Sequence, residues 1–344
     1  MTMTARKTRD SNMELLRLVA MLLVMMVHAS YRALPKPTPE AIAADSVSMF
    51  LQIMVESFTV VGVNVFIMLS GWYGIRLRWS RLIELFFQVA FFTILCLGVY
   101  YALTDTLPPS PFLSILMLHE GDYWFVKTYL ALYLISPVLN AFVQTATQRQ
   151  MVVTLLSLFV FQWLYGWVFE ATTWLRAGYS LPSFVYLYLF ARYLNIYKPS
   201  FTKWRPRTDL CIYLSICMAV TVAYFLLKRH FNLGGLLWFY NSPTAIIAAM
   251  FLLLFFSKLT FHSKVVNWLG ISALAVYLTH SNSPLGQYYD IYIREWHDTL
   301  PRLPFILRTG LFIAAVFFGS ILIDKVRVVV WNLLLKLPWL RTSR

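Results

Sequence analysis

Charged side chains are scarce in this sequence. Only 13% of its 344 residues are charged, whereas 59% are hydrophobic; a soluble domain carries about a quarter charged residues. This composition excludes an ordinary soluble domain. The apolar residues gather into runs of roughly 17 to 25 residues, the length that crosses a bilayer as a helix. The sequence therefore predicts an all-α polytopic membrane protein.

Cysteine and acidic residues are also few. All three cysteines lie within apolar runs, so neither a disulfide framework nor a zinc-ligand spacing is present. Basic residues outnumber acidic ones by 29 to 15, which gives a net charge of +14. They occur in short segments between apolar runs, a pattern that indicates membrane topology and no nucleic-acid partner. No metal-ligand spacing, phosphate loop or nucleophile elbow appears, and we expect no metal.

Ten apolar runs are long enough to span a membrane. They cover approximately residues 13–31, 50–72, 81–103, 123–142, 150–169, 180–197, 209–228, 237–257, 264–283 and 304–324. The segment "EATTWLRAGYSLPS" separates the fifth from the sixth run only weakly. We predict one integral domain of ten transmembrane helices over residues 13–330. A short N-terminal segment, 1–12, precedes it, and a basic tail, 331–344, follows it.

The distribution of lysine and arginine orients these ten spans. Nineteen basic residues fall on the side that holds both termini, eight fall on the other side, and Arg17 and Lys127 lie within spans. Positively charged loops remain in the cytoplasm. Both termini are therefore predicted to be cytoplasmic, although the basic loop "LKRHFN" falls on the outer side.

The first run, "MELLRLVAMLLVMMVHAS", contains Arg17 near one end and His28 near the other. Ionisable side chains inside a membrane are costly and often functional. Eleven helical residues give about 20° of rotation and about 16 Å of rise, so the two side chains face the same way at different depths. A snorkelling arginine and a packed, hydrogen-bonded histidine are the structural alternatives. Ser11 and Glu14 have the spacing of a capping box at the start of this helix.

Other polar residues fall near the same two depths. Towards the cytoplasm, Arg78 and Arg81 open the third run three residues apart, so a helix would place them on one face, where they could bind phosphates. The excess of cytoplasmic charge alone also accounts for them. Ser70 lies near the inner end of the second run.

Towards the outside, the fourth run begins with Trp124 and Lys127, and the ninth run ends at His280. The aromatic residue is also typical of an interfacial belt, and the lysine of snorkelling. Glu56 and Asn64 lie within the second run, and Glu56 could pair with His28 or Lys127.

Several motifs in this order resemble the membrane-bound acyltransferase 3 family, bacterial integral membrane O-acyltransferases. The spacing Arg17-x10-His28 is similar to the family's feature in the first span, and Arg78-x-x-Arg81 to its basic motif at the third. Three further stretches resemble its second, fourth and ninth spans: "NVFIMLSGWYG", "YWFVKTYLALYLISPVLN" and "LGISALAVYLTH". The likeness runs from about residue 10 to 330.

The resemblance implies transfer of an acyl group, commonly acetyl from acetyl-CoA, to a sugar hydroxyl of a cell-surface polysaccharide or its lipid-linked precursor. It also implies a location in the bacterial inner membrane. His28 would be the catalytic base, and Arg17, Arg78, Arg81 and Ser70 would lie on the donor side. As our own mechanistic hypothesis, Lys127, Trp124 or His280 could orient the sugar or stabilise the developing oxyanion, and Glu56 and Asn64 could support the acceptor. Direct attack on the thioester and a two-step route through an acyl-histidine are both chemically open.

Two other classes of protein fit the same polar residues. A translocase or flippase of a lipid-linked saccharide would need charged groups along a water-filled route, which the same side chains could supply. The chain lacks paired Gly/Pro-broken spans at matching positions of two halves, which inverted repeats would produce. A structural subunit of a glycan-synthesis complex would leave Arg17 and His28 replaceable.

Overall fold

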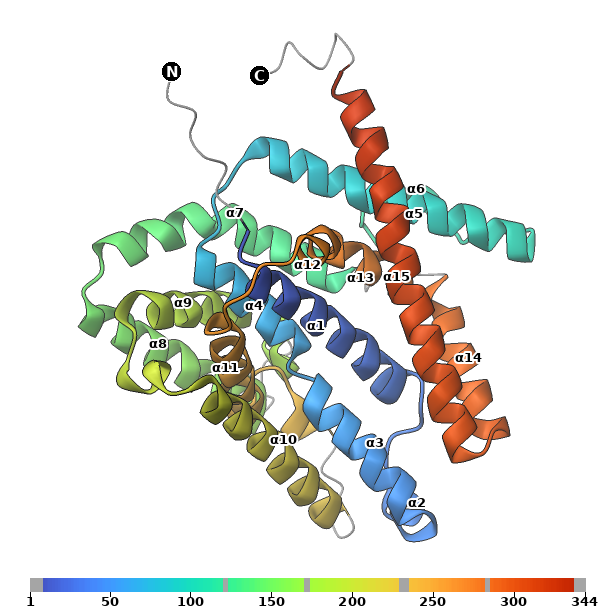
Figure 1. Ribbon diagram of the computed structural model, residues 1–344, viewed down its shortest axis with the longest axis horizontal. Coiled ribbons are helices and arrows are strands. Elements are labelled where there is room, and N and C mark those ends of the chain that lie inside the picture. The colour runs from blue at the N-terminus through green and yellow to red at the C-terminus, as the bar shows by residue number, and fades with distance from the viewer. Residues whose placement is uncertain (1–8, 120–122, 170–173, 229–234, 282–284, 337–344) are drawn as a thin grey trace.

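The computed structural model describes residues 9–119, 123–169, 174–228, 235–281 and 285–336, and these residues form helices and no strands (Figure 1). Among them, eight helical segments are long and apolar enough to cross a membrane. They are Ser11–Arg32, Ser46–Tyr73, Trp79–Thr104, Trp124–Thr145, Gln148–Val168, Pro206–Lys228, Leu236–Ser257 and Arg302–Leu334. The predicted all-α polytopic membrane fold is confirmed.

The other two predicted spans are shorter helices. The sixth corresponds to α9 (Leu181–Tyr197), which has 17 residues. The ninth is divided into α12 (Lys264–Gly270) and α13 (Ala273–His280). The total of ten spans and the cytoplasmic side of the termini remain predictions.

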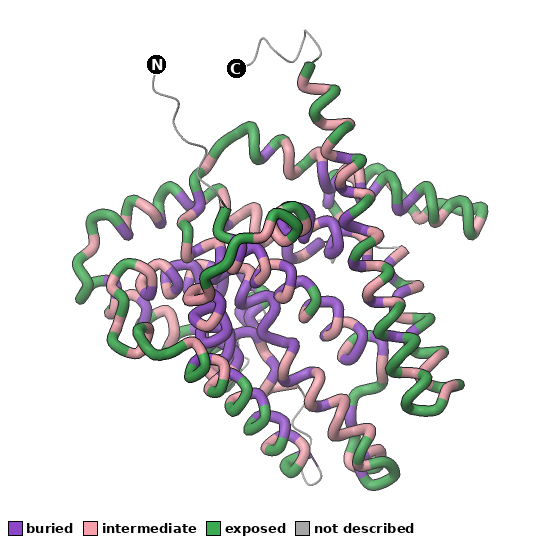
Figure 2. The backbone as a smooth tube through the Cα atoms, viewed as in Figure 1, coloured by how far each residue is buried: buried purple, intermediate pink, exposed green. Residues whose placement is uncertain are grey.

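A buried group of helices forms the centre of the molecule (Figure 2). It consists of α1 (Ser11–Val27), α4 (Gly62–Tyr73) and α11 (Pro243–Ser257), with α9 packed against α4. The peripheral helices expose apolar side chains, as a lipid-facing surface requires. These are α5 (Trp79–Thr104), α7 (Trp124–Thr145), α8 (Gln148–Trp163), α10 (Pro206–Lys228) and α15 (Arg302–Leu334).

Two central spans are interrupted. The second predicted span consists of α3 (Ser46–Thr59) and α4, with a break at residues 60–61. The first continues beyond Val27 into a wider π-helical turn, His28–Arg32, in which the Ala33 backbone N–H donates to the His28 carbonyl at 3.0 Å. Such turns recur at functional sites. Here the turn begins at the histidine that the sequence analysis singled out.

The connections after the first, third and ninth predicted spans contain the helices α2 (Pro39–Ala44), α6 (Pro111–Ile115) and α14 (Gly286–Thr299). Single turns complete the fold at Leu164–Val168, Arg176–Gly178, Ser200–Lys203 and Leu236–Trp238. In Figure 1, α14 lies alongside α15.

The predicted capping box at the start of α1 is wrong. Asp10 precedes the helix, and Ser11 is already its first residue. The Ser11 hydroxyl accepts a hydrogen bond from the Ser263 backbone N–H at 2.9 Å. Glu14 is bonded to the guanidinium groups of Arg9 and Arg17, which are stronger partners for a carboxylate than a terminal N–H. Tertiary contacts therefore replace the local motif.

The described ends of the chain lie on one side of the molecule. Lys325 of α15 is close enough to Arg9 for the two charges to interact. Helix α15 continues past the predicted end at residue 324 and through the start of the predicted tail at 331. Residues 1–8 and 337–344, which make up most of the predicted terminal segments, lie outside the described residues.

Candidate active site

A cavity of about 120 Å³ lies at the end of α1 that carries His28. Its lining includes the imidazole of His28 and the carboxyl group of Glu56. Aromatic side chains form most of the remaining wall: Tyr31, Trp124, Tyr179, Trp238, Phe239 and Tyr240. Its volume approaches the ~150 Å³ of a protein cavity that holds benzene, so it has room for about one six-membered ring.

His28 reaches this cavity from the π-helical turn, and its ring contacts a second histidine. Nδ1 of His28 lies 2.9 Å from Nε2 of His280, with the ring centroids 5.0 Å apart. The Ser281 hydroxyl lies 3.3 Å from the same Nδ1. His280 is only 2% exposed, and its Nδ1 lies 2.6 Å from the carbonyl oxygen of Val276. The structure thus brings together two residues that are 252 positions apart.

Helix α14 and the π-helical turn hold His280 in place. Arg32 donates to the His280 carbonyl at 3.3 Å and forms an ion pair with Asp290 at 2.6 Å. Partial burial raises the pKa of Asp290 above its usual range, and the neighbouring Arg32 opposes this shift. The Tyr289 ring lies 5.4 Å from the His280 ring, and its hydroxyl donates to the Met25 carbonyl at 2.9 Å.

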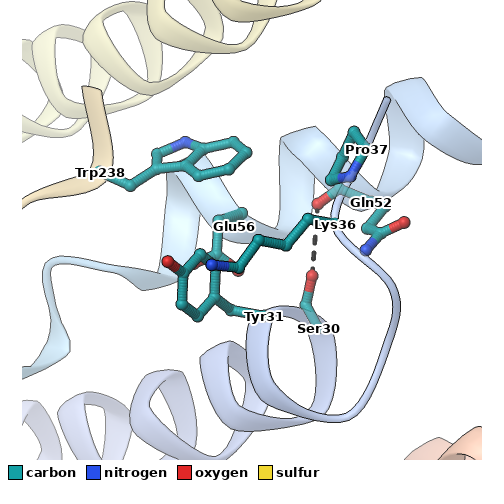
Figure 3. A pocket seen from close by; sticks show the side chains of 7 residues that line it. All are labelled: Ser30, Tyr31, Lys36, Pro37, Gln52, Glu56 and Trp238. Atoms are coloured by element: carbon teal, nitrogen blue, oxygen red, sulfur yellow. Dashed lines mark hydrogen bonds between the residues drawn. The ribbon is translucent and has the colours of Figure 1, made fainter. Parts of the chain in front are cut away.

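Glu56 is a buried carboxylate at the edge of the cavity. It is 3% exposed, and its Oε2 atom has no hydrogen-bond partner among the described residues. Figure 3 shows it beside Tyr31, Trp238 and the extended side chain of Lys36. The Lys36 ammonium lies 4.7 Å from the centre of the Tyr31 ring and interacts electrostatically with Glu56.

Of the two partners suggested for Glu56, His28 and Lys127, the second is wrong. Lys127 donates instead to the His119 carbonyl at 2.9 Å, because it lies one turn from the start of α7 and reaches back towards the preceding loop. Lys127 is also absent from the cavity wall. The cation beside Glu56 is Lys36, which lies in the loop after the first span.

Of the other residues predicted on the acceptor side, Trp124 lines the cavity and Asn64 supports its wall from behind. Trp124 lines the cavity, with its ring 4.5 Å from Tyr179 and 6.1 Å from Tyr240. Asn64 is fully buried and donates to the Tyr240 carbonyl at 2.9 Å. Asn64 therefore supports an aromatic residue of the wall and lies behind it.

Arg17 lies with the predicted donor-side residues at the opposite end of α1. It is bonded to Glu14 and interacts electrostatically with Tyr129 of α7. The Tyr129 hydroxyl lies 3.3 Å from the Ser70 hydroxyl. Helix α7 therefore meets Arg17 through Tyr129 and the His28 cavity through Trp124.

Arg78 and Arg81 do not share a helical face. Arg78 has extended backbone angles and precedes α5, so only Arg81 lies within the helix. Both side chains are exposed, and Arg81 forms an ion pair with Glu84 at 2.8 Å. The carbonyl of Arg78 accepts from the Tyr133 hydroxyl of α7 at 3.2 Å. The segment that carries these arginines is therefore fixed to α7.

Most of the aromatic wall was missed in the sequence. Tyr31, Tyr179, Trp238 and Tyr240 come from three separate segments, and aromatic residues make up 17% of the chain. No local spacing distinguishes them from aromatic residues of the membrane interface. Only the fold shows that they converge.

A family model described as an acyltransferase domain matches residues 10–325. The chain belongs to the acyltransferase 3 family. No curated protein and no solved structure matches it. Members of this family are acyltransferases that move groups other than amino-acyl groups, so of the three functional classes considered above the family selects the enzyme. The cavity beside His28 lies within the matched residues and is the candidate active site of this membrane acyltransferase.

Proposed function

We propose that the protein transfers an acyl group, acetyl in the simplest case, from cytoplasmic acyl-CoA to a sugar hydroxyl. The sugar belongs to a cell-surface polysaccharide or to its lipid-linked precursor. The protein acts in the inner membrane of a bacterium, and His28 is the general base. The donor approaches from the end of α1 that carries Arg17, and the acceptor occupies the cavity at the His28 end.

The observation that carries this proposal is the position of His28. Its ring lines a cavity of about 120 Å³ together with Glu56 and several aromatic rings. Aromatic faces suit the C–H face of a sugar ring, and a buried carboxylate suits its hydroxyl groups. A histidine can accept a hydroxyl proton near neutral pH. These side chains are the ones required to bind a sugar and to activate one of its oxygens.

The proposed reaction is a direct displacement. Nε2 of His28 takes the proton of the acceptor hydroxyl while the oxygen attacks the thioester carbonyl. The tetrahedral intermediate collapses with loss of the CoA thiolate, and the His28 imidazolium returns its proton to that sulfur. The products are an ester and free CoA, and the histidine is regenerated.

The donor side needs positive charge for the phosphates of CoA. Arg17 lies in the N-terminal half of α1, close to Tyr129, whose hydroxyl contacts Ser70. Arg78 and Arg81 are exposed at the start of α5, where Arg78 can bind phosphate oxygens from the aqueous phase and Arg81 can do so by exchanging its ion pair with Glu84. We assign these residues to donor binding.

Inverted membrane vesicles with radiolabelled acetyl-CoA on their cytoplasmic face test the proposal. We expect the wild type to move label into glycan material. His28→Asn keeps a side-chain donor near the position of Nδ1 but removes the base, so it should lower the rate about 10²- to 10⁴-fold. Arg17→Ala should act mainly on the KM for acetyl-CoA. Equal labelling by wild type and His28→Asn would contradict the assigned base.

Label retained on the protein in the absence of acceptor would contradict the direct displacement. A covalent acyl-histidine would then be the intermediate. Arg149→Ala provides a matched control, because Arg149 is exposed in the first turn of α8, outside both proposed sites. Its labelling rate should equal that of the wild type.

A further inference from the structure

We infer that His280 is a positioning residue that fixes the tautomer of His28. The chain Val276 carbonyl–His280–His28 places the proton of His28 on Nδ1 and leaves the lone pair of Nε2 for the cavity. This inference rests on the proposed function, because it specifies how His28 is prepared to act as a base.

The first link is the hydrogen bond between His280 and Val276. A backbone carbonyl oxygen can only accept, so at 2.6 Å the Nδ1 atom of His280 must carry the proton. The two residues are four positions apart on α13. The link is therefore local to one helix turn and does not depend on how other helices pack.

The second link is the contact between the two imidazole rings. A neutral His280 with its proton on Nδ1 has a bare Nε2, which can only accept. Nδ1 of His28 lies 2.9 Å from this atom. Two bare nitrogen atoms at this distance would repel each other, so the shared proton belongs to Nδ1 of His28.

The environment of the two rings favours this arrangement. The Arg32 guanidinium donates to the His280 backbone carbonyl and is paired with Asp290. Its positive charge disfavours a second proton on His280. The Ser281 hydroxyl lies further from Nδ1 of His28, at 3.3 Å, and can accept from the same N–H.

The consequence is a prepared base. A neutral His28 with its proton on Nδ1 has its lone pair on Nε2, and no described residue forms a hydrogen bond with that nitrogen. His28 lines the cavity, and the carboxyl group of Glu56 lies at its edge. An incoming hydroxyl therefore meets an acceptor nitrogen and needs no prior change of tautomer. In histidine-dependent enzymes the partner of the other ring nitrogen has this orienting effect.

Two substitutions at His280 separate positioning from packing. His280→Leu removes the acceptor for Nδ1–H of His28. His280→Gln retains an amide oxygen that can accept this hydrogen bond and an amide N–H₂ that can donate. In the vesicle assay we expect His280→Leu to lower kcat about 10- to 10⁴-fold, the upper bound being the loss seen when a triad histidine is held in the wrong tautomer. The KM for acceptor should change little, and His280→Gln should recover most of the rate.

Nitrogen-15 NMR of the six histidines reads the tautomer directly, and the His28→Asn spectrum identifies the His28 signals. We expect Nδ1 protonated and Nε2 bare in the neutral wild type, and a shift towards protonated Nε2 in His280→Leu. A proton on Nε2 of His28 in the wild type would overturn the inference, even if His280→Leu does not fold.

The same assays distinguish this inference from the proposed function. Full activity of His28→Asn would contradict the proposed function. Inactive His28→Asn together with a wild-type kcat for His280→Leu would leave the general base intact and overturn only the role of His280.

Discussion

At the scale of single residues, the position of Glu56 predicts that it binds the acceptor. It is almost fully buried, one of its oxygens has no partner among the described residues, and it faces a cavity lined by aromatic rings. Buried polar groups are nearly always satisfied, so an unpartnered oxygen here needs a ligand or a water molecule. We propose that a hydroxyl group of the acceptor occupies this position.

We predict that Glu56→Gln weakens acceptor binding without disturbing the base. A hydrogen bond between a sugar hydroxyl and this side chain contributes about 0.5–1.5 kcal/mol, so the KM for acceptor should rise about 2- to 10-fold while the KM for acetyl-CoA stays unchanged. Initial rates at varied acceptor concentration measure this. Glu295→Gln, an exposed substitution on α14, is the control, and an equal effect of both would contradict a specific role for Glu56.

The chemistry of single residues was partly visible in the sequence. His28 and Glu56 stand out because ionisable side chains are rare in apolar runs, and His280 because it ends one. Their partners could not be predicted. His28 meets His280 across 252 residues, and Glu56 meets Lys36 because the loop after α1 folds back over it. Such contacts depend on the packing of whole helices.

At the scale of helices, close approach between α4 and α9 depends on Gly71. A Cβ atom added at this position would collide with the backbone carbonyl of Tyr188. The Tyr188 hydroxyl in turn donates to Asn140 of α7 at 2.6 Å. Gly71 therefore allows α4 to approach α9, which is in turn bonded to α7 through Tyr188.

We predict that Gly71→Ala destabilises the protein by about 1–3 kcal/mol, the usual cost of overpacking a core. Thermal unfolding in detergent micelles measures the change. Gly310→Ala is a matched control that should not destabilise the protein, since an added Cβ there meets nothing within 4 Å. It should be neutral or stabilising by about 0.5–1 kcal/mol because alanine favours the helix. A Gly71→Ala variant as stable as Gly310→Ala would contradict the packing described here.

Helix existence followed from the sequence, whereas helix interruptions did not. Composition and run length identify membrane spans because lipid demands them over a fixed thickness. No proline lies at the break between α3 and α4 or in the π-helical turn at His28, so the sequence does not predict either interruption. Both breaks border the cavity, where buried neighbours can satisfy the altered backbone.

At the scale of the whole molecule, Asp45 and Arg302 join the starts of two distant spans. Arg302, at the start of α15, forms an ion pair with Asp45 at 3.0 Å beside the start of α3. Hydrogen bonds from the Ser48 backbone and side chain lower the pKa of Asp45 to about 2, with Arg302 adding to the effect. The depressed pKa means that this contribution to stability is complete above about pH 4 and is lost as the pH falls towards 2.

We predict that Asp45→Asn lowers the Tm at pH 6 and that the difference from wild type disappears near pH 2. Asparagine can still accept from the Ser48 backbone N–H, so the comparison isolates the charge. Thermal unfolding of both proteins across this range in detergent is the measurement. A difference that is independent of pH would show that the ion pair does not contribute.

We propose that donor binding at the Arg17 end of α1 and chemistry at the His28 end lie towards opposite faces of the membrane. Membrane-impermeant radiolabelled acetyl-CoA, added to inverted and to right-side-out vesicles containing the wild-type protein, tests it most directly. We expect glycan material to be labelled only in inverted vesicles, whose cytoplasmic face is exposed. Equal labelling in both orientations, or labelling only in right-side-out vesicles, would contradict it.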